Sequence, residues 1–163
     1  MPRIATIGDV NVDLIARIDR MPGLGKQVIT EDFQTHGGGC SANFSLSCAR
    51  LGMDSQLFGK VGDDVFGTYV LVELEDNHVD TKNVRLTDST TGVTVAMVQG
   101  TERSFITFRG ENATYCLNDI DVSKIRADIV HLPSYFLLDG LRNDYAKLID
   151  VLHAAKVQVS FDT

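Results

Sequence analysis

The sequence predicts an α/β fold in which a parallel β-sheet is flanked by helices. Short apolar runs, bounded by glycine, proline or polar residues, have the length and composition of buried strands. Between them lie segments whose apolar residues recur every three to four positions, the spacing of an amphipathic helix. Strands that alternate with helices form parallel sheets. The expected strands are residues 4–8, 56–61, 128–132 and 157–161, with a further short strand indicated at 84–86. The expected helices are about 41–50, 65–77 and 141–155.

Three polar residues follow the first strand directly. Asp9, Asn11 and Asp13 are separated by single valines. Alternate residues of an extended chain share one face, so these side chains line one side. The two oxygens of the Asp13 carboxylate suit two neighbouring hydroxyls of a polyol, and Asn11 adds a donor and an acceptor. The alternative is ordinary turn and helix-cap chemistry, in which Asp and Asn are common.

Three consecutive glycines, Gly37, Gly38 and Gly39, lead into the helix expected at 41–50. Glycine permits unusual backbone angles and close approach of another molecule. A helix that begins after such a loop presents free backbone N–H groups and the positive end of its dipole to a ligand. Asn43 lies in the first turn, so its amide is expected to face the same space. The alternative is a plain tight turn before a core helix.

Two further regions alternate between apolar and polar residues and are expected to lie outside the main layer. Residues 28–36 form a strand with one face in water, and residues 92–99 and 104–109 form a hairpin around a turn. Together they are expected to make a small second sheet. The helix at 65–77 follows a turn in which Asp63 or Asp64 supplies the N-terminal cap.

The bulk composition limits the classes of function. The chain has 163 residues, enough for one domain, and its net charge is −7 without a basic cluster, which argues against a nucleic-acid partner. No apolar run approaches the roughly 20 residues that cross a bilayer, and the first residues lack the apolar segment of a secretion signal. The three cysteines, which are Cys40, Cys48 and Cys116, are widely spaced and odd in number, as is typical of reduced thiols. We therefore expect a cytoplasmic protein.

Four stretches of the chain resemble the N-terminal half of the ribokinase-like carbohydrate kinases, the PfkB family. They are residues 8–13, 38–43, 49–52 and 58–67. The resemblance implies a ribokinase-like parallel sheet flanked by helices with a small β-sheet lid. Residues 1–163 are then the N-terminal part of one such domain, with the C-terminal half of the fold absent. The lid strands are expected at about 12–18, 28–36, 92–99 and 104–109.

The resemblance also implies a function, the ATP-dependent phosphorylation of a sugar or sugar-like alcohol. ATP and Mg²⁺ are expected in the complete enzyme, with a homodimer formed through the lid. Arg103 and Phe105 are possible contacts from the lid. Cys40 occupies a position where some ribose-specific members carry lysine, which leaves pentoses, ketohexoses, sugar acids and nucleosides open. The residues implied to bind substrate hydroxyls are Asn11, Asp13, Gly38, Gly39 and Asn43.

The catalytic base of the family is the aspartate of a Gly-Ala-Gly-Asp block, which does not occur in these 163 residues. No residue of the chain is therefore assigned as catalytic. The aspartate is expected beyond Thr163, and the chain alone is predicted to be inactive. The alternative function is a non-catalytic fragment that binds sugar or dimerises through its lid.

Three other patterns in the sequence point to different functions and fit less well. Gly37, Gly39 and Ala42 fit the G-x-G-x-x-[GA] pattern of a dinucleotide-binding oxidoreductase. In that class the loop follows the first strand directly, whereas here the first expected strand, residues 4–8, ends well before the loop. Gly39 and Ser41 match the start of the serine-hydrolase pattern G-x-S-x-G, but Asn43 stands where its last glycine is required, which argues against a serine hydrolase. The spacing of His36 and the three cysteines matches no metal-binding motif, so no metal site is predicted.

Overall fold

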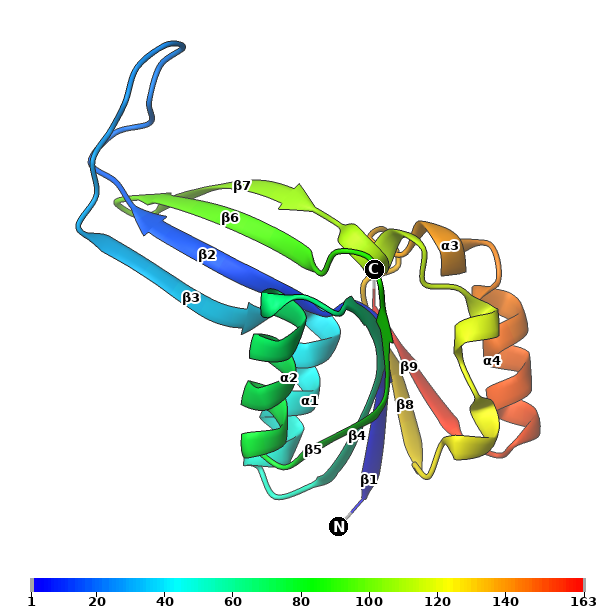
Figure 1. The fold of residues 1–163 in the computed structure, drawn as a ribbon. Coiled ribbons are helices and arrows are strands. Elements are labelled where there is room, and N and C mark those ends of the chain that lie inside the picture. The colour runs from blue at the N-terminus through cyan, green and yellow to red at the C-terminus, as the bar shows by residue number, and fades with distance from the viewer. Residues whose placement is uncertain (1, 163) are drawn as a thin grey trace.

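The computed structural model describes residues 2–162, which form two β-sheets (Figure 1). The first sheet has five parallel strands in the order β5-β4-β1-β8-β9. Its strands are β1 (Arg3–Ile7), β4 (Asp54–Gly62), β5 (Val79–Thr87), β8 (Ile129–Leu132) and β9 (Gln158–Phe161). The second sheet is mixed, with the order β3-β2-β6-β7. Its strands are β2 (Asn11–Arg17), β3 (Asp32–Gly38), β6 (Gly92–Gln99) and β7 (Glu102–Phe108).

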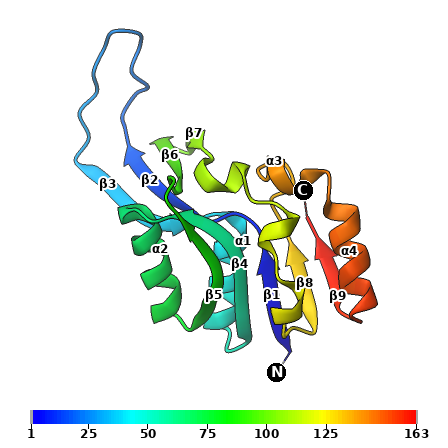
Figure 2. The same cartoon turned by 45° about the vertical axis from the view of Figure 1, so that its right-hand side comes forward.

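Helices cover both faces of the parallel sheet, as Figure 2 shows. The helices α1 (Cys40–Arg50) and α2 (Val65–Asp76) lie on one face. The helices α3 (Asp139–Arg142) and α4 (Tyr145–Ala154) lie on the other, together with three short 3-10 turns between residues 110 and 124. None of the helices within residues 2–162 is long and apolar enough to cross a bilayer.

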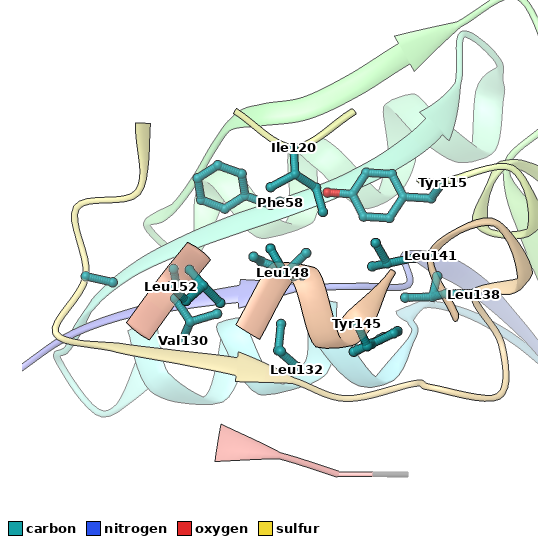
Figure 3. Close-up of a cluster of buried hydrophobic side chains, with 13 residues drawn as sticks. Phe58, Tyr115, Ile120, Val130, Leu132, Leu138, Leu141, Tyr145, Leu148 and Leu152 are labelled. Atoms are coloured by element: carbon teal, nitrogen blue, oxygen red, sulfur yellow. The ribbon is translucent and has the colours of Figure 1, made fainter. Parts of the chain in front are cut away.

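The alternation of side chains along β4 divides the core into two layers. Leu57 packs toward α1 and α2 with Val12 and Val70, whereas its neighbour Phe58 packs toward α4. The layer beneath α4 is drawn in Figure 3, where leucines from α4 meet the side chains of β8. Its largest fully buried members are Ile7, Phe58, Tyr115, Leu132, Leu138, Leu141, Leu148 and Leu152.

The predicted α/β fold is confirmed. The short strand indicated at 84–86 belongs to the longer β5, the helix expected at 141–155 is divided into α3 and α4, and the other differences lie at element ends. The strand expected at 28–36 begins at Asp32 and continues to Gly38, because residues 18–31 form a loop that projects from the second sheet (Figure 1). Leu51, the apolar residue that directly follows α1, is 70% exposed. The buried face of α1 instead carries small side chains, which let the helix approach the sheet closely: Ser41, Ala42, Ser45 and Cys48.

Asp64 is the N-terminal cap of α2. Its Oδ1 accepts the backbone N–H of Gly67 at 2.7 Å, and its Oδ2 accepts the backbone N–H of Thr91 at 2.8 Å. The cap therefore joins α2 to the start of β6. We expect Asp64→Ala to lower the free energy of unfolding by about 1–2 kcal/mol, measured by urea denaturation. Wild-type stability in this variant would show that the cap contributes nothing.

Candidate functional site

A glycine turn between β3 and α1 forms the centre of the candidate site. Gly38 pairs with Asn11 at the start of β2, and Gly39 precedes the helix with a φ of 93°. A Cβ at Gly39 would lie 2.6 Å from the Asp9 carbonyl oxygen, and one at Gly38 would overlap the Asp13 carboxylate. The position of Gly39 therefore requires glycine, because of its positive φ and its contact with backbone atoms, and the Asp13 carboxylate lies directly against the Gly38 backbone.

The carboxylate of Asp9, a residue between β1 and β2, lies at the N-terminus of α1. This side chain is 1% exposed, and its two oxygens accept the backbone N–H groups of Cys40 and Ser41, each at 3.1 Å. It also accepts hydrogen bonds from the hydroxyl of Ser134 and the amide of Asn11. The prediction that the helix start offers free N–H groups to a ligand is therefore wrong for Cys40 and Ser41. A buried carboxylate satisfies these donors, as a helix terminus requires.

Asn11 is buried and held by protein groups. Its Nδ2 lies 3.3 Å from Asp9 Oδ2, and its Oδ1 accepts a 2.7 Å hydrogen bond from Asn112 Nδ2. Asn112 also bonds both backbone groups of Val10. Asn11 therefore fixes the chain between β1 and β2. The sequence interpretation missed Asn112 and Ser134, because each is distant in sequence and belongs to no local motif.

Asp13 lies next to this network but outside it. Its side chain is half-buried, and none of residues 2–162 donates a hydrogen bond to its carboxylate. Burial raises the pKa of Asp13, the negative charge of Asp9 raises it further, and His36 opposes the rise. Burial of an unpaired carboxylate is unfavourable. The arrangement leaves two acceptor oxygens available to a ligand.

Asn43 lies on the other side of the glycine turn. Its backbone N–H donates to the Gly39 carbonyl at 2.9 Å, which places it in the first turn of α1. Its side chain is exposed, and its amide has no hydrogen-bond partner among residues 2–162. Asp13 therefore lies against Gly38, and Asn43 stands in the helical turn that begins at Gly39. The structure brings the five predicted binding residues to one corner, although Asn11 faces the protein network.

The two possible lid contacts share the Asp13 face of the second sheet. Directly paired residues point to the same face, and Asp13 pairs with Thr94, which pairs with Thr107. Phe105 lies in the next row and Arg103 in the row after that, about 7 and 13 Å away along the strands. Both side chains are exposed.

Other features of the described residues do not add to this site. A hollow of about 660 Å³ lies at the far end of the second sheet, with Arg17, Ile29 and Val98 among its lining residues. Within residues 2–162, no three His, Cys, Asp or Glu side chains are grouped so as to hold a metal ion.

Comparison with known proteins places the chain in a family. The sequence model described as "pfkB family carbohydrate kinase" matches residues 1–163. The chain is 34% identical over 166 aligned positions to an ATP-dependent ribose-1-phosphate kinase of Halopiger xanaduensis, covering 99% of this chain and 54% of that protein. It is 33% identical over 126 positions to a ribokinase of Bacillus subtilis, covering 74% of this chain and 43% of that protein.

Solved structures agree with these matches. A sugar kinase from Pyrococcus horikoshii superposes with a TM-score of 0.79 at 31% identity, covering 98% of this chain and 54% of that one. Arabidopsis thaliana ribokinase, solved with ribose and ATP, superposes with a TM-score of 0.82 at 25% identity, covering 99% and 53%. The chain spans about half the length of these relatives, and it belongs to the pfkB family of carbohydrate kinases.

Proposed function

We propose that the chain supplies the sugar-binding half of an enzyme that phosphorylates a sugar or sugar-like alcohol with ATP. The observation that carries this proposal is the Asp13 carboxylate, which is half-buried beside Gly38 and receives no hydrogen bond from residues 2–162. A polyol offers the donors that such a carboxylate lacks. The Arabidopsis relative, whose structure holds ribose and ATP, supports the same substrate class.

In this proposal each residue of the corner has a separate role. The Asp13 oxygens accept two hydroxyls, and the side-chain-free Gly38 and Gly39 let the sugar approach the backbone. The Asn43 amide donates to or accepts from a third hydroxyl. Asp9 and Asn11 hold the turn in place and act as positioning residues.

Phosphoryl transfer requires groups that this sequence does not supply. The Gly-Ala-Gly-Asp block is absent from the 163 residues, and a general base contributes typically 10²–10⁴-fold to such a reaction. We therefore propose that the chain alone is inactive and that ATP and Mg²⁺ bind with residues of a C-terminal half like that of the relatives. Mg²⁺ is usually held by phosphates, water and one or two carboxylates.

The second sheet is proposed to act as the lid and as the surface of a homodimer. Its face opposite Asp13 carries three large exposed apolar side chains, each 57–62% exposed: Phe33, Ile106 and Phe108. Apolar side chains gathered on one sheet face favour association with another surface. Sedimentation velocity measurements on the chain test the dimer directly.

Asn43→Ala is expected to weaken sugar binding by about tenfold, the value of one hydrogen bond, without lowering the melting temperature. The amide has no partner within residues 2–162, so the fold loses no bond. Calorimetric titration and thermal melting of the same samples measure both quantities. A lower melting temperature with unchanged affinity would assign Asn43 to the helix start instead.

The proposed function is tested by calorimetric titration of the chain with D-ribose, D-fructose and adenosine, followed by an assay of ADP release. We expect binding of one of them and no ADP release until the C-terminal half of a pfkB kinase is added. Binding without activity in that mixture would favour the non-catalytic sugar-binding function. No binding of any polyol would contradict the proposal.

A further inference from the structure

His36 lies beside the Asp13 carboxylate on the same face of the second sheet. The two residues are directly opposite each other in the antiparallel pair of β3 and β2. Side chains in such a pair have Cβ atoms about 5 Å apart.

A chain of hydrogen bonds along β3 orients the His36 ring. Alternate residues of this strand share a face, and Gln34 Nε2 donates to Asp32 Oδ1 at 2.9 Å. Asp32 is fixed in turn by Arg17, with 3.0 Å between Oδ2 and Nε. The Nε2 atom of His36 lies 3.1 Å from Gln34 Oε1.

The direction of these bonds determines which ring nitrogen remains available. A carboxylate only accepts, so the amide NH₂ of Gln34 faces Asp32 and its carbonyl oxygen faces His36. The His36 Nε2 must then carry a hydrogen. In the neutral ring Nδ1 keeps its lone pair, and it has no hydrogen-bond partner among residues 2–162.

We propose that His36 is a specificity-determining residue of the sugar site. Its Nδ1 accepts a hydroxyl adjacent to one of the two that Asp13 holds, so the two side chains together select a run of neighbouring hydroxyls. The inference rests on the proposed sugar-binding function and adds the identity of a second acceptor. It predicts that polyols lacking the hydroxyl next to those held by Asp13 lose the contribution of His36.

Two substitutions separate the ring nitrogens. Asn places an acceptor oxygen near the position of Nδ1, whereas Gln places its polar end near that of Nε2. By calorimetric titration with the tightest-binding of D-ribose, D-fructose and adenosine, we expect His36→Leu and His36→Gln to lose affinity about tenfold. His36→Asn should stay within about threefold of the wild type. A matched control is His153→Leu, an exposed histidine on α4, which should bind normally.

Deoxy analogues of the same ligand complete the test. Against the analogue that lacks the hydroxyl held by His36, the wild type and His36→Leu should bind with equal affinity. If binding depends on Asp13 but is unchanged in His36→Leu, this inference is overturned and the sugar site stands. If none of the three polyols binds the wild type, the proposed sugar-binding function and the role of His36 are both overturned. Thermal melting of each variant identifies any loss that comes from misfolding.

Discussion

Asp13→Asn should abolish sugar binding, with a loss of at least about 100-fold. The substitution keeps the size of the side chain but replaces one acceptor oxygen with a donor, so two hydroxyls can no longer be accepted together. A site built to pair with hydroxyls discriminates strongly when one partner is mismatched. Calorimetric titration with D-ribose, D-fructose and adenosine measures the loss.

The same substitution should not lower stability at neutral pH. Burial and Asp9 raise the pKa of Asp13 in the folded protein above its ordinary value of 3.8. A group with a raised acid pKa favours the folded state at low pH, and this contribution is lost as pH rises through the folded pKa. At pH 7 the ionised carboxylate therefore costs stability, and the neutral amide removes that cost.

The melting temperature of Asp13→Asn at pH 7 should equal or exceed that of the wild type. A suitable control is Asp150→Asn, because Asp150 is an exposed aspartate on α4, far from the glycine turn in the chain. Asp150→Asn should change neither the sugar affinity nor the melting temperature. Retained affinity in Asp13→Asn, with a reduced melting temperature, would assign the carboxylate to structure rather than to substrate.

Asp9→Ala should destabilise the fold strongly, by about 2–4 kcal/mol in urea denaturation. The substitution removes the acceptor of two backbone N–H groups, one amide and one hydroxyl, all at a buried position. Unsatisfied buried donors cost about 1–3 kcal/mol each, partly relieved by water. Loss of a helix cap alone costs about 1 kcal/mol.

Asp9→Asn keeps one acceptor oxygen and should lie between the wild type and Asp9→Ala. The exposed Asp150→Ala provides the control, with no measurable change expected. Wild-type stability in Asp9→Ala together with lost sugar affinity would contradict the role given to Asp9. It would restore the interpretation in which the start of α1 faces the ligand.

The elements of the fold were predictable where the signal is local. The apolar runs of β1 and β8, the hairpin of β6 and β7, and the Asp64 cap each depend on a few neighbouring residues. The start of β3 was not predictable, because nothing in residues 28–31 marks where pairing with β2 begins. Pairing is set by the partner strand, which the local pattern does not contain.

The candidate site divides in the same way. Asp13, Asn43 and the glycines belong to compact motifs, and the structure places them around one turn. The role of Asp9 depends on Ser134, a residue 125 positions away. Contacts between residues so far apart in the sequence come from tertiary packing. Local spacing could therefore indicate that polar residues lie at a strand end, but not which of them have hydrogen-bond partners within the protein.

The most direct test is the structure of the chain with a bound polyol, with D-ribose, D-fructose or adenosine as the ligand. We expect two hydroxyls about 3 Å from the Asp13 carboxylate oxygens and the Asn43 amide at the same sugar. A polyol that binds elsewhere, or one that contacts the glycine turn without Asp13, would contradict the assignment of this corner as the sugar site.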